Sequence, residues 1–197
     1  MYDYRKMTPE ERQQVLKERS ARGFPLHSPP HFHGIGGHYL ITAACYEHHP
    51  IFEHTEDLSY LADELLNALK TAAIQPQVWV FLPNHYHFLA HVEEIGIISE
   101  TLRLAHSRIA THVNGRRHQR GRKVWYRFSD RLIRNEQHFL ATINYIHYNP
   151  VKHGYVDNAD TWAWSSIHNY VETQGEHWLA QTWKDYPILD YGKGWDW

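Results

Sequence analysis

The sequence lacks several features on which common classes of protein depend. Its 197 residues include one cysteine, Cys45, which excludes an internal disulfide framework and a zinc site of four cysteines. It has no leading apolar signal segment and no run of about eighteen apolar residues that would cross a membrane. We therefore expect a soluble, cytoplasmic chain without a membrane partner, organised as one domain with a substantial core.

A large excess of positive charge is also missing. The formal net charge is −2, whereas nucleic-acid-binding proteins usually carry a basic balance. Residues 103–134, however, contain half of the chain's 20 Lys and Arg and a single acidic residue, Asp130. A solvated surface would account for such a run, but this asymmetry within a near-neutral chain favours phosphate binding. The candidate DNA-binding residues are Arg103, Arg108, Arg116, Arg117, Arg120, Arg122, Lys123, Arg127, Arg131 and Arg134.

Two histidines separated by one residue, His85 and His87, stand within a short hydrophobic run. In an extended strand, residues i and i+2 point to the same face about 6.6 to 7 Å apart, so both imidazoles can aim at one point. The flanking apolar residues predict a buried strand over 85–92, preceded by a turn at Pro83 and Asn84. Core or surface histidines would produce the same pattern, and a metal site needs at least one further donor.

Hydrophobic periodicity predicts an α+β fold. Apolar runs and amphipathic spacing give, in order, strand 38–46, helix 58–73, strand 77–82, strand 85–92, helix 98–113 and strand material over 124–133. This βαββαβ order is that of a ferredoxin-like antiparallel sheet with helices on one face. A C-terminal helix follows from Glu136 to about Tyr148, where Pro150 should end or kink it. Residues 152–154 predict a C-terminal cap or a turn.

The two ends of the chain have simpler patterns. Thr8, Pro9 and Glu11 form a capping box, which predicts a charged surface helix to about Arg22. A linker rich in proline and glycine follows over 23–37. Beyond the helix that starts at Glu136, the abundant Trp and Tyr residues predict an irregular segment that wraps the core.

The helix after the sheet carries a second group of polar residues. Tyr145 and Asn149 stand four apart, and residues i and i+4 share one face of a helix. A tyrosine hydroxyl and an amide oxygen would therefore be presented together. The hydroxyl could act as a nucleophile and the amide as a third metal donor, whereas a break at Pro150 would leave Asn149 as a turn residue.

Three short segments of the sequence resemble those of a known family. The run 82–87, Leu-Pro-Asn-His-Tyr-His, resembles the HUH motif of single-strand DNA transposases. Residues 145–156 resemble the tyrosine motif of the REP-associated tyrosine transposases, and residues 162–166 are similar to a downstream Trp-Ser-Ser segment in the same proteins. The resemblance covers roughly residues 38–172, which we expect to form the HUH domain, between an N-terminal helix and linker (1–37) and a C-terminal aromatic extension (173–197).

The resemblance implies a fold and a reaction. The ferredoxin-like HUH fold agrees with the order of elements above. His85, His87 and Asn149 would hold Mg²⁺ or Mn²⁺, and Tyr145 would attack a phosphorus of single-stranded or hairpin DNA. The products would be a 5′-phosphotyrosine link and a free 3′-hydroxyl, from which the strands can be rejoined. The basic stretch would hold the DNA backbone, and aromatic residues could stack unpaired bases.

Three alternatives remain open from the sequence. Tyr148 lies in the same motif and competes with Tyr145 as the nucleophile. A protein of another class would keep the hairpin-binding surface and act as a regulator without cleaving DNA. A metal-dependent phosphodiester hydrolase would use water as the nucleophile in place of tyrosine. We expect a monomer, with a dimer as the alternative, and a chain that associates with the nucleoid when bound to DNA.

Overall fold

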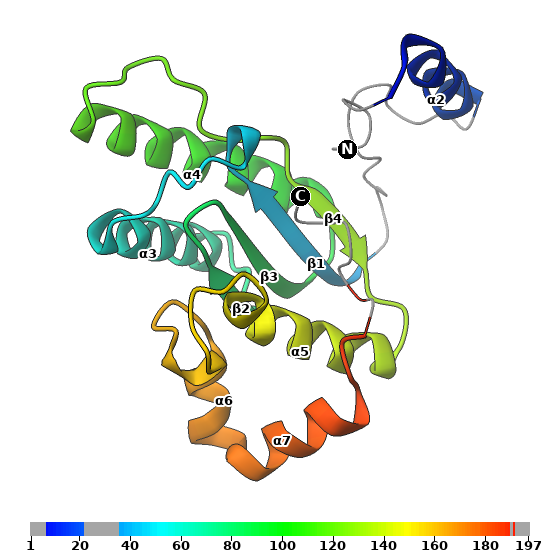
Figure 1. Cartoon of the computed structure of the whole chain (residues 1–197), viewed down its shortest axis with the longest axis vertical. Helices are drawn as coiled ribbons and strands as arrows, with labels where there is room; N and C mark the ends of the chain where they lie inside the picture. Colours follow the sequence, from blue (N-terminus) through cyan, green and yellow to red (C-terminus); the bar gives the residue numbers. More distant parts are fainter. Residues whose placement is uncertain (1–6, 22–35, 190, 192–197) are drawn as a thin grey trace.

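A four-stranded antiparallel sheet positions the candidate site (Figure 1). The computed structural model describes residues 7–21, 36–189 and 191. The strands are β1 (Gly37–Ala44), β2 (Pro76–Phe81), β3 (His85–Val92) and β4 (Ser129–Leu132). They lie in the order β2-β3-β1-β4, with every neighbouring pair antiparallel. The predicted ferredoxin-like α+β fold is therefore confirmed.

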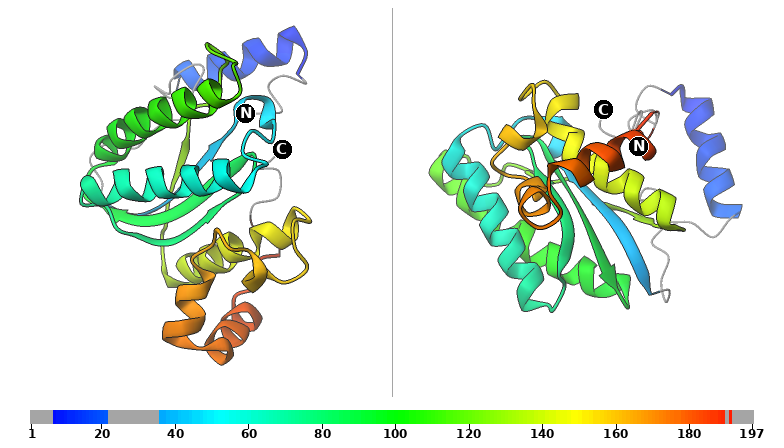
Figure 2. Two further views of the ribbon diagram at one scale, coloured as in Figure 1. Left: turned by 90° about the vertical axis from the view of Figure 1, so that its left-hand side faces the viewer. Right: turned by 90° about the horizontal axis from the view of Figure 1, so that it is seen from below.

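Helices cover both faces of this sheet (Figure 2). On one face lie α3 (Thr55–Thr71) and α4 (Ile95–Arg116), which enclose the larger hydrophobic core. On the other face lies α5 (Glu136–Lys152), followed by the short η2 (Ala159–Thr161) and by α6 (Ile167–Gln174) and α7 (Glu176–Asp185). The sequence placed the first two helices on a common face and the tyrosine on a separate C-terminal helix, as observed.

The alternation of side chains along β3 decides which residues reach which layer. Tyr86, Phe88 and Ala90 point into the core under α3 and α4. Leu89 points the other way, into the core under α5, and successive residues of a strand point to opposite faces. His85 and His87 therefore belong to the α5 face, where their ring nitrogens meet side chains of α5.

The predicted capping box at the start of α2 (Pro9–Ala21) is present. The Thr8 backbone N–H donates to Glu11 Oε2 at 2.7 Å, and the Glu11 N–H donates to Thr8 Oγ1 at 3.3 Å. These two bonds satisfy donors that the first turn of a helix otherwise leaves open. The predicted linker lies mainly in residues 22–35, outside the described residues.

The expectation that Pro150 would end or kink the tyrosine helix at about Tyr148 was wrong, because α5 runs to Lys152. Pro150 stands in the last turn, where only one hydrogen bond is lost. The end is closed by Gly154, with φ of 71°. Its N–H donates to the Val151 carbonyl, and the Tyr155 N–H donates to the Pro150 carbonyl. This Schellman motif confirms the predicted cap and keeps Asn149 helical.

Two further expectations differ from the structure. Residues 124–128 form no strand of their own: they make an isolated bridge, Cys45 to Trp125, and the hydrogen bonds Tyr46 N–H to the Val124 carbonyl and Tyr126 N–H to the Ala44 carbonyl. The fourth strand, β4, begins at Ser129. The C-terminal aromatic residues are also more regular than expected. Apolar residues three to four apart allow α6 and α7 to pack around Leu179, so this part is helical.

The segment 162–166 lies along β2, the edge strand of the sheet. The Phe81 N–H donates to the Trp164 carbonyl, and the Ser166 N–H donates to the Trp79 carbonyl, both at 2.9 Å. An exposed strand edge invites unwanted pairing, so this segment protects the sheet. Within the described ranges, no helix has the length and apolar character needed to cross a membrane.

Candidate functional site

The histidine pair sits at the start of β3, with the two rings inclined at 77° and their centroids 5.0 Å apart. Both side chains are buried. His85 Nδ1 donates to Asn84 Oδ1 at 2.7 Å, and His87 Nδ1 lies 2.7 Å from the Thr42 hydroxyl. A partner on Nδ1 is what orients a metal-binding histidine and leaves the Nε2 lone pair for the ion.

Helix α5 brings the two predicted partners to the Nε2 sides of the imidazoles. The Tyr145 hydroxyl lies 3.3 Å from His87 Nε2, and Asn149 Oδ1 lies 2.9 Å from His85 Nε2. Tyr145 and Asn149 are both buried and occupy the same face of the helix, as their spacing predicts. One chain therefore brings together all four residues that the sequence singled out for catalysis and metal binding.

The donors at His85 suit a divalent cation. In the tautomer whose Nδ1–H donates to Asn84, the Nε2 lone pair of His85 faces the Asn149 oxygen. A divalent cation bound between these two atoms would accept both lone pairs. The 2.9 Å between these two atoms would allow both to bind one small divalent cation.

Two further observations concern the metal donors. Asn149 Nδ2 is buried without a hydrogen-bond partner among the described residues, and the amide contacts His85 through its oxygen. Three or more His, Cys, Asp or Glu side chains do not cluster around a common point within 7–21, 36–189 and 191. A site here would thus depend on two imidazoles and one amide, a set that leaves positions open for phosphate oxygens or water.

A buried histidine of α5, His147, links this helix to the segment 162–166. The sequence did not suggest a role for it. His147 Nε2 lies 3.1 Å from Ser166 Oγ, and this hydroxyl accepts the Trp79 N–H at 2.9 Å. Burial lowers the pKa of His147 to about 3, so the ring is neutral. The tyrosine motif and the Trp-Ser-Ser segment are therefore in contact, and Ser166 connects α5 to β2 at the edge of the sheet.

Side chains from three elements surround Tyr145. Lys152 Nζ lies 5.0 Å from the centroid of its ring, and the Tyr191 ring lies 5.4 Å away. Burial raises the pKa of Tyr191, against a hydrogen bond to Thr142 and the charge of Arg131, which lower it. Partial burial lowers the pKa of Arg131, whereas Tyr191 and Tyr145 raise it. The tyrosine thus has cations on both its helix side and its sheet side.

Three further residues in or near the two motifs, Tyr148, His91 and His153, have different surroundings. Tyr148 is 39% exposed and lines a cavity of about 260 Å³ with Val151 and Trp183, on a different side of α5 from Tyr145. His91, on the same strand as the histidine pair, is exposed and lies beside Glu93. His153 was expected only as part of a turn, yet its ring centroid lies 4.8 Å from that of His85.

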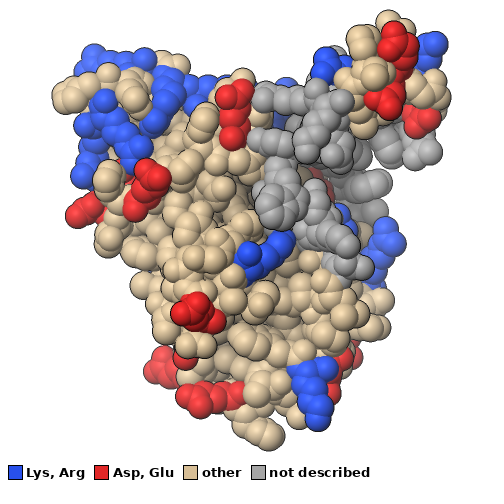
Figure 3. All heavy atoms as spheres, in the orientation of Figure 1, with Lys and Arg blue, Asp and Glu red and all other residues tan. Residues whose placement is uncertain are grey.

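The ten basic residues do not form one surface. Arg103 and Arg108 lie on α4, which covers the sheet face opposite to the histidine pair. Arg103 pairs with Glu100 at 2.6 Å, and Arg108 pairs with Glu64 of α3. Lys and Arg gather visibly over the C-terminal end of α4 and the loop that follows (Figure 3). This cluster is separated from the α5 face by the sheet.

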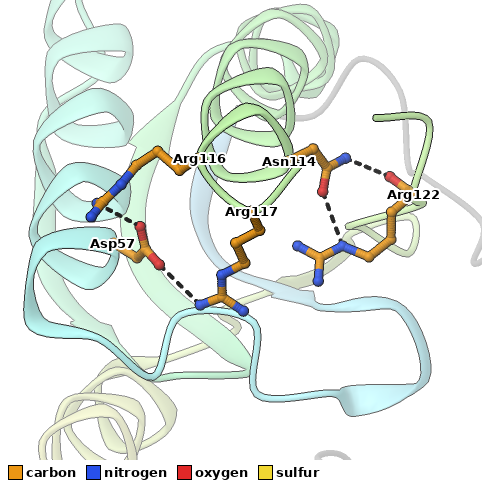
Figure 4. A network of polar contacts seen from close by, with 5 residues as sticks. All are labelled: Asp57, Asn114, Arg116, Arg117 and Arg122. Carbon is orange, nitrogen blue, oxygen red and sulfur yellow. Dashed lines mark hydrogen bonds and ion pairs between the residues drawn. The ribbon is translucent and has the colours of Figure 1, made fainter. Parts of the chain in front are cut away.

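Several of these arginines also serve the fold itself (Figure 4). Arg116 and Arg117 donate to the two carboxylate oxygens of Asp57 at 2.8 and 2.9 Å, and this aspartate is only 3% exposed. Arg122 Nε donates to Asn114 Oδ1, and Asn114 Nδ2 donates to the Arg122 carbonyl. The contacts of Asp57 join the C-terminal end of α4 to the start of α3, and those of Arg122 hold the following loop against α4.

The remaining basic residues have different surroundings. Lys123 Nζ lies over the Tyr46 ring, 4.4 Å from its centroid. Arg120, Arg127 and Arg134 are exposed. Arg131 pairs in register with Leu40 of β1, and residues opposite each other in a sheet project from the same face. Arg131 therefore projects from the face that carries the histidine pair.

The contacts of Asp57 lead to a stability prediction. Replacing Arg116 and Arg117 together by alanine leaves a buried carboxylate without its cations, so we expect the free energy of unfolding to fall by about 3 kcal/mol. Urea denaturation measures this change. The control is the double replacement of exposed Arg120 and Arg127, which removes the same charge and should cost less than about 0.5 kcal/mol. Equal losses in both variants would contradict a structural role for the pair.

The fold and the placement of the site residues agree with what the resemblance to the HUH motif implies. A ferredoxin-like sheet carries the two histidines, and a separate helix carries the tyrosine beside them. No profile of a known protein family matches the sequence.

The relatives that the chain matches share one name. Over 118 residues, 59% of this chain and 68% of the other, it is 26% identical to the REP-associated tyrosine transposase of Escherichia coli strain K12. Over 52 residues it is 42% identical to a Haemophilus influenzae protein provisionally given the same name. That match covers 26% of this chain and only 30% of the Haemophilus protein.

A solved structure of a REP-associated tyrosine transposase bound to a REP hairpin has a similar fold. The TM-score is 0.62 with 24% identity, over 75% of this chain and 86% of that one. These comparisons confirm the resemblance to REP-associated tyrosine transposases that the two motifs predicted.

Proposed function

We propose that this chain is a metal-dependent transposase-type enzyme that nicks and rejoins single-stranded DNA beside hairpin-forming repeats, with Tyr145 as its nucleophile. The observation that carries the proposal is the meeting of Tyr145 with His87, at 3.3 Å, and of Asn149 with His85, at 2.9 Å. A nucleophile and a set of metal donors within one chain are what a cleavage through a covalent intermediate requires.

Each residue has a defined part in this reaction. His85, His87 and Asn149 would hold Mg²⁺ or Mn²⁺, which would supply Lewis-acid polarisation of the scissile phosphate. Asn84 and Thr42 keep the two imidazoles turned with Nε2 toward the site. Tyr145 forms a bond to phosphorus as the bond from phosphorus to the 3′ oxygen breaks. Attack by the freed 3′-hydroxyl on the phosphotyrosine reverses the step and joins strands.

Two arguments favour this function over the alternatives. A hydrolase with a water nucleophile does not need a buried tyrosine hydroxyl beside a histidine of the site. A regulator that only binds hairpins does not need the ordered imidazole and amide donors. Because all these groups come from one chain, we propose that the tyrosine acts within its own subunit and that a monomer is sufficient.

The proposed substrate is a DNA hairpin with single-stranded flanks. The support comes from the solved relative, which is bound to a REP hairpin. In this chain, Arg131 and Arg134 lie near the α5 face and are suited to hold the backbone beside the site. The cluster after α4 is suited to a second, more distant contact. Such a chain would act in the cytoplasm, at the nucleoid.

Denaturing electrophoresis tests this function directly. Full-length protein is mixed with 5′- or 3′-labelled hairpin oligonucleotides that carry single-stranded flanks, with Mn²⁺ or Mg²⁺. We expect a protein band that retains the DNA label after denaturation, together with a free 3′-hydroxyl fragment. Hairpin binding without any such band would favour the regulator, and cleavage without a covalent band would favour the hydrolase.

A further inference from the structure

A lysine on α5 belongs to the site although neither the motifs nor the metal set assigns it a role. Lys152 follows Tyr145 by seven residues, which brings it back to nearly the same side of a helix with 3.6 residues per turn. Its Nζ lies 5.0 Å from the Tyr145 ring centroid. Asn149 lies between them in sequence, so one face of α5 carries the nucleophile, a metal donor and a cation.

The charge of this lysine is useful where phosphate must approach. The proposed metal donors, two imidazoles and one amide, are neutral and add no charge of their own. Lys152 above the ring and Arg131 on the sheet side supply positive charge around Tyr145. A phosphate oxygen within reach of the tyrosine hydroxyl therefore enters a region that favours anions.

We propose that Lys152 is a catalytic residue whose ammonium binds a non-bridging oxygen of the scissile phosphate. This inference rests on the proposed function, because it requires attack by Tyr145 on phosphorus. For in-line attack the phosphorus must lie about 3 to 3.5 Å from the tyrosine oxygen. The phosphate then lies beside the ring that Lys152 already contacts, and a charged hydrogen bond replaces the weaker contact with the ring.

The bonds that change in this step are those of the phosphodiester. The Tyr145 oxygen bonds to phosphorus, and the bond from phosphorus to the 3′ oxygen breaks, with its electron pair left on that oxygen. The phenolic proton is released to solvent, and the 3′ oxygen takes up a proton from solvent. Lys152 keeps its protons throughout and offsets the additional negative charge on the phosphoryl oxygens in the transition state. The same phosphate remains beside it in the phosphotyrosine intermediate.

Replacement of the lysine should affect chemistry far more than hairpin binding. In single-turnover reactions, we expect Lys152→Gln to slow adduct formation by about 100-fold. Lys152→Arg, which keeps the charge, should stay within about 10-fold of the unaltered chain. The matched control is Lys70→Gln, since Lys70 is an exposed lysine on α3, across the sheet. Affinity for the hairpin alone, without the flank that carries the cleavage position, should change by less than about 3-fold in every variant when followed by fluorescence anisotropy.

A second measurement separates phosphate contact from a structural role. Tyr145→Phe protein, which cannot react, is titrated with oligonucleotides that carry either a phosphodiester or an uncharged methylphosphonate at the cleavage position mapped with the unaltered chain. We expect the phosphodiester to bind more tightly, and we expect Tyr145→Phe/Lys152→Gln to lose most of that preference. An unchanged preference, or an unslowed Lys152→Gln, would overturn the inference. Failure of the unaltered chain to form any adduct would instead overturn the proposed function, and the role of Lys152 with it.

Discussion

We expect Tyr145→Phe to eliminate the covalent DNA adduct, with a fall in its rate of formation of more than about 1,000-fold. In the proposed reaction the hydroxyl is the atom that bonds to phosphorus, and removing the nucleophile of a covalent mechanism leaves no second route to the adduct. The phenyl ring still fills its buried position against His87 and Tyr191. We therefore expect hairpin affinity and the melting temperature to remain close to those of the unaltered chain.

Tyr148→Phe is the matched control, because it removes the same atom from the competing tyrosine of the motif. Tyr148 lies beside Trp183, with ring centroids 6.3 Å apart, on a different side of α5. We expect it to form the adduct at the normal rate in the same labelled-DNA assay. Loss of the adduct in Tyr148→Phe, with retention in Tyr145→Phe, would contradict the assignment of the nucleophile.

The second large effect concerns the proposed metal site. Chelation with EDTA should abolish adduct formation, and excess Mn²⁺ should restore it. Asn149→Ala removes an oxygen donor while leaving both imidazoles, so we expect the Mn²⁺ concentration for half-maximal activity to rise by about 100-fold. His87→Ala should lose activity at every Mn²⁺ concentration.

Two controls make this metal test specific. His91→Ala removes an exposed imidazole from the same strand and should respond to Mn²⁺ like the unaltered chain. Direct binding of Mn²⁺, followed by electron paramagnetic resonance, should weaken in Asn149→Ala and remain unchanged in His91→Ala. Full activity of Asn149→Ala at low Mn²⁺ would contradict its role as a ligand.

Much of the site could be predicted because its geometry is local. The two-residue period of a strand places His85 and His87 on one face, and the helical period places Tyr145 and Asn149 on another. The βαββαβ order then leaves the tyrosine helix on the sheet face not covered by α3 and α4. The two pairs meet because the histidines project from the sheet face that α5 covers, and Tyr145 and Asn149 project from the side of α5 that faces the sheet.

Other features depend on contacts between distant residues and could not be predicted. The sequence predicts Arg116 and Arg117 as DNA-binding residues, but it could not predict that both also hold Asp57, which is about sixty positions away. The continuation of α5 through Pro150 is accompanied by the Schellman motif at Gly154. The sequence predicted a cap at residues 152–154, but the helix was still expected to end or kink at Pro150. Lys152 could have been found by the same spacing that linked Tyr145 with Asn149, continued by one more turn.

The identity of the residue joined to DNA tests the central claim most directly. The covalent complex is digested with a protease and a nuclease, and the peptides that retain a nucleotide are sequenced by mass spectrometry. We predict that a 5′-phosphonucleotide is attached to Tyr145 alone, and that the peptide with Tyr148 modified is not found. A nucleotide on Tyr148 or on another residue, or its attachment through a 3′-phosphate, would contradict the account.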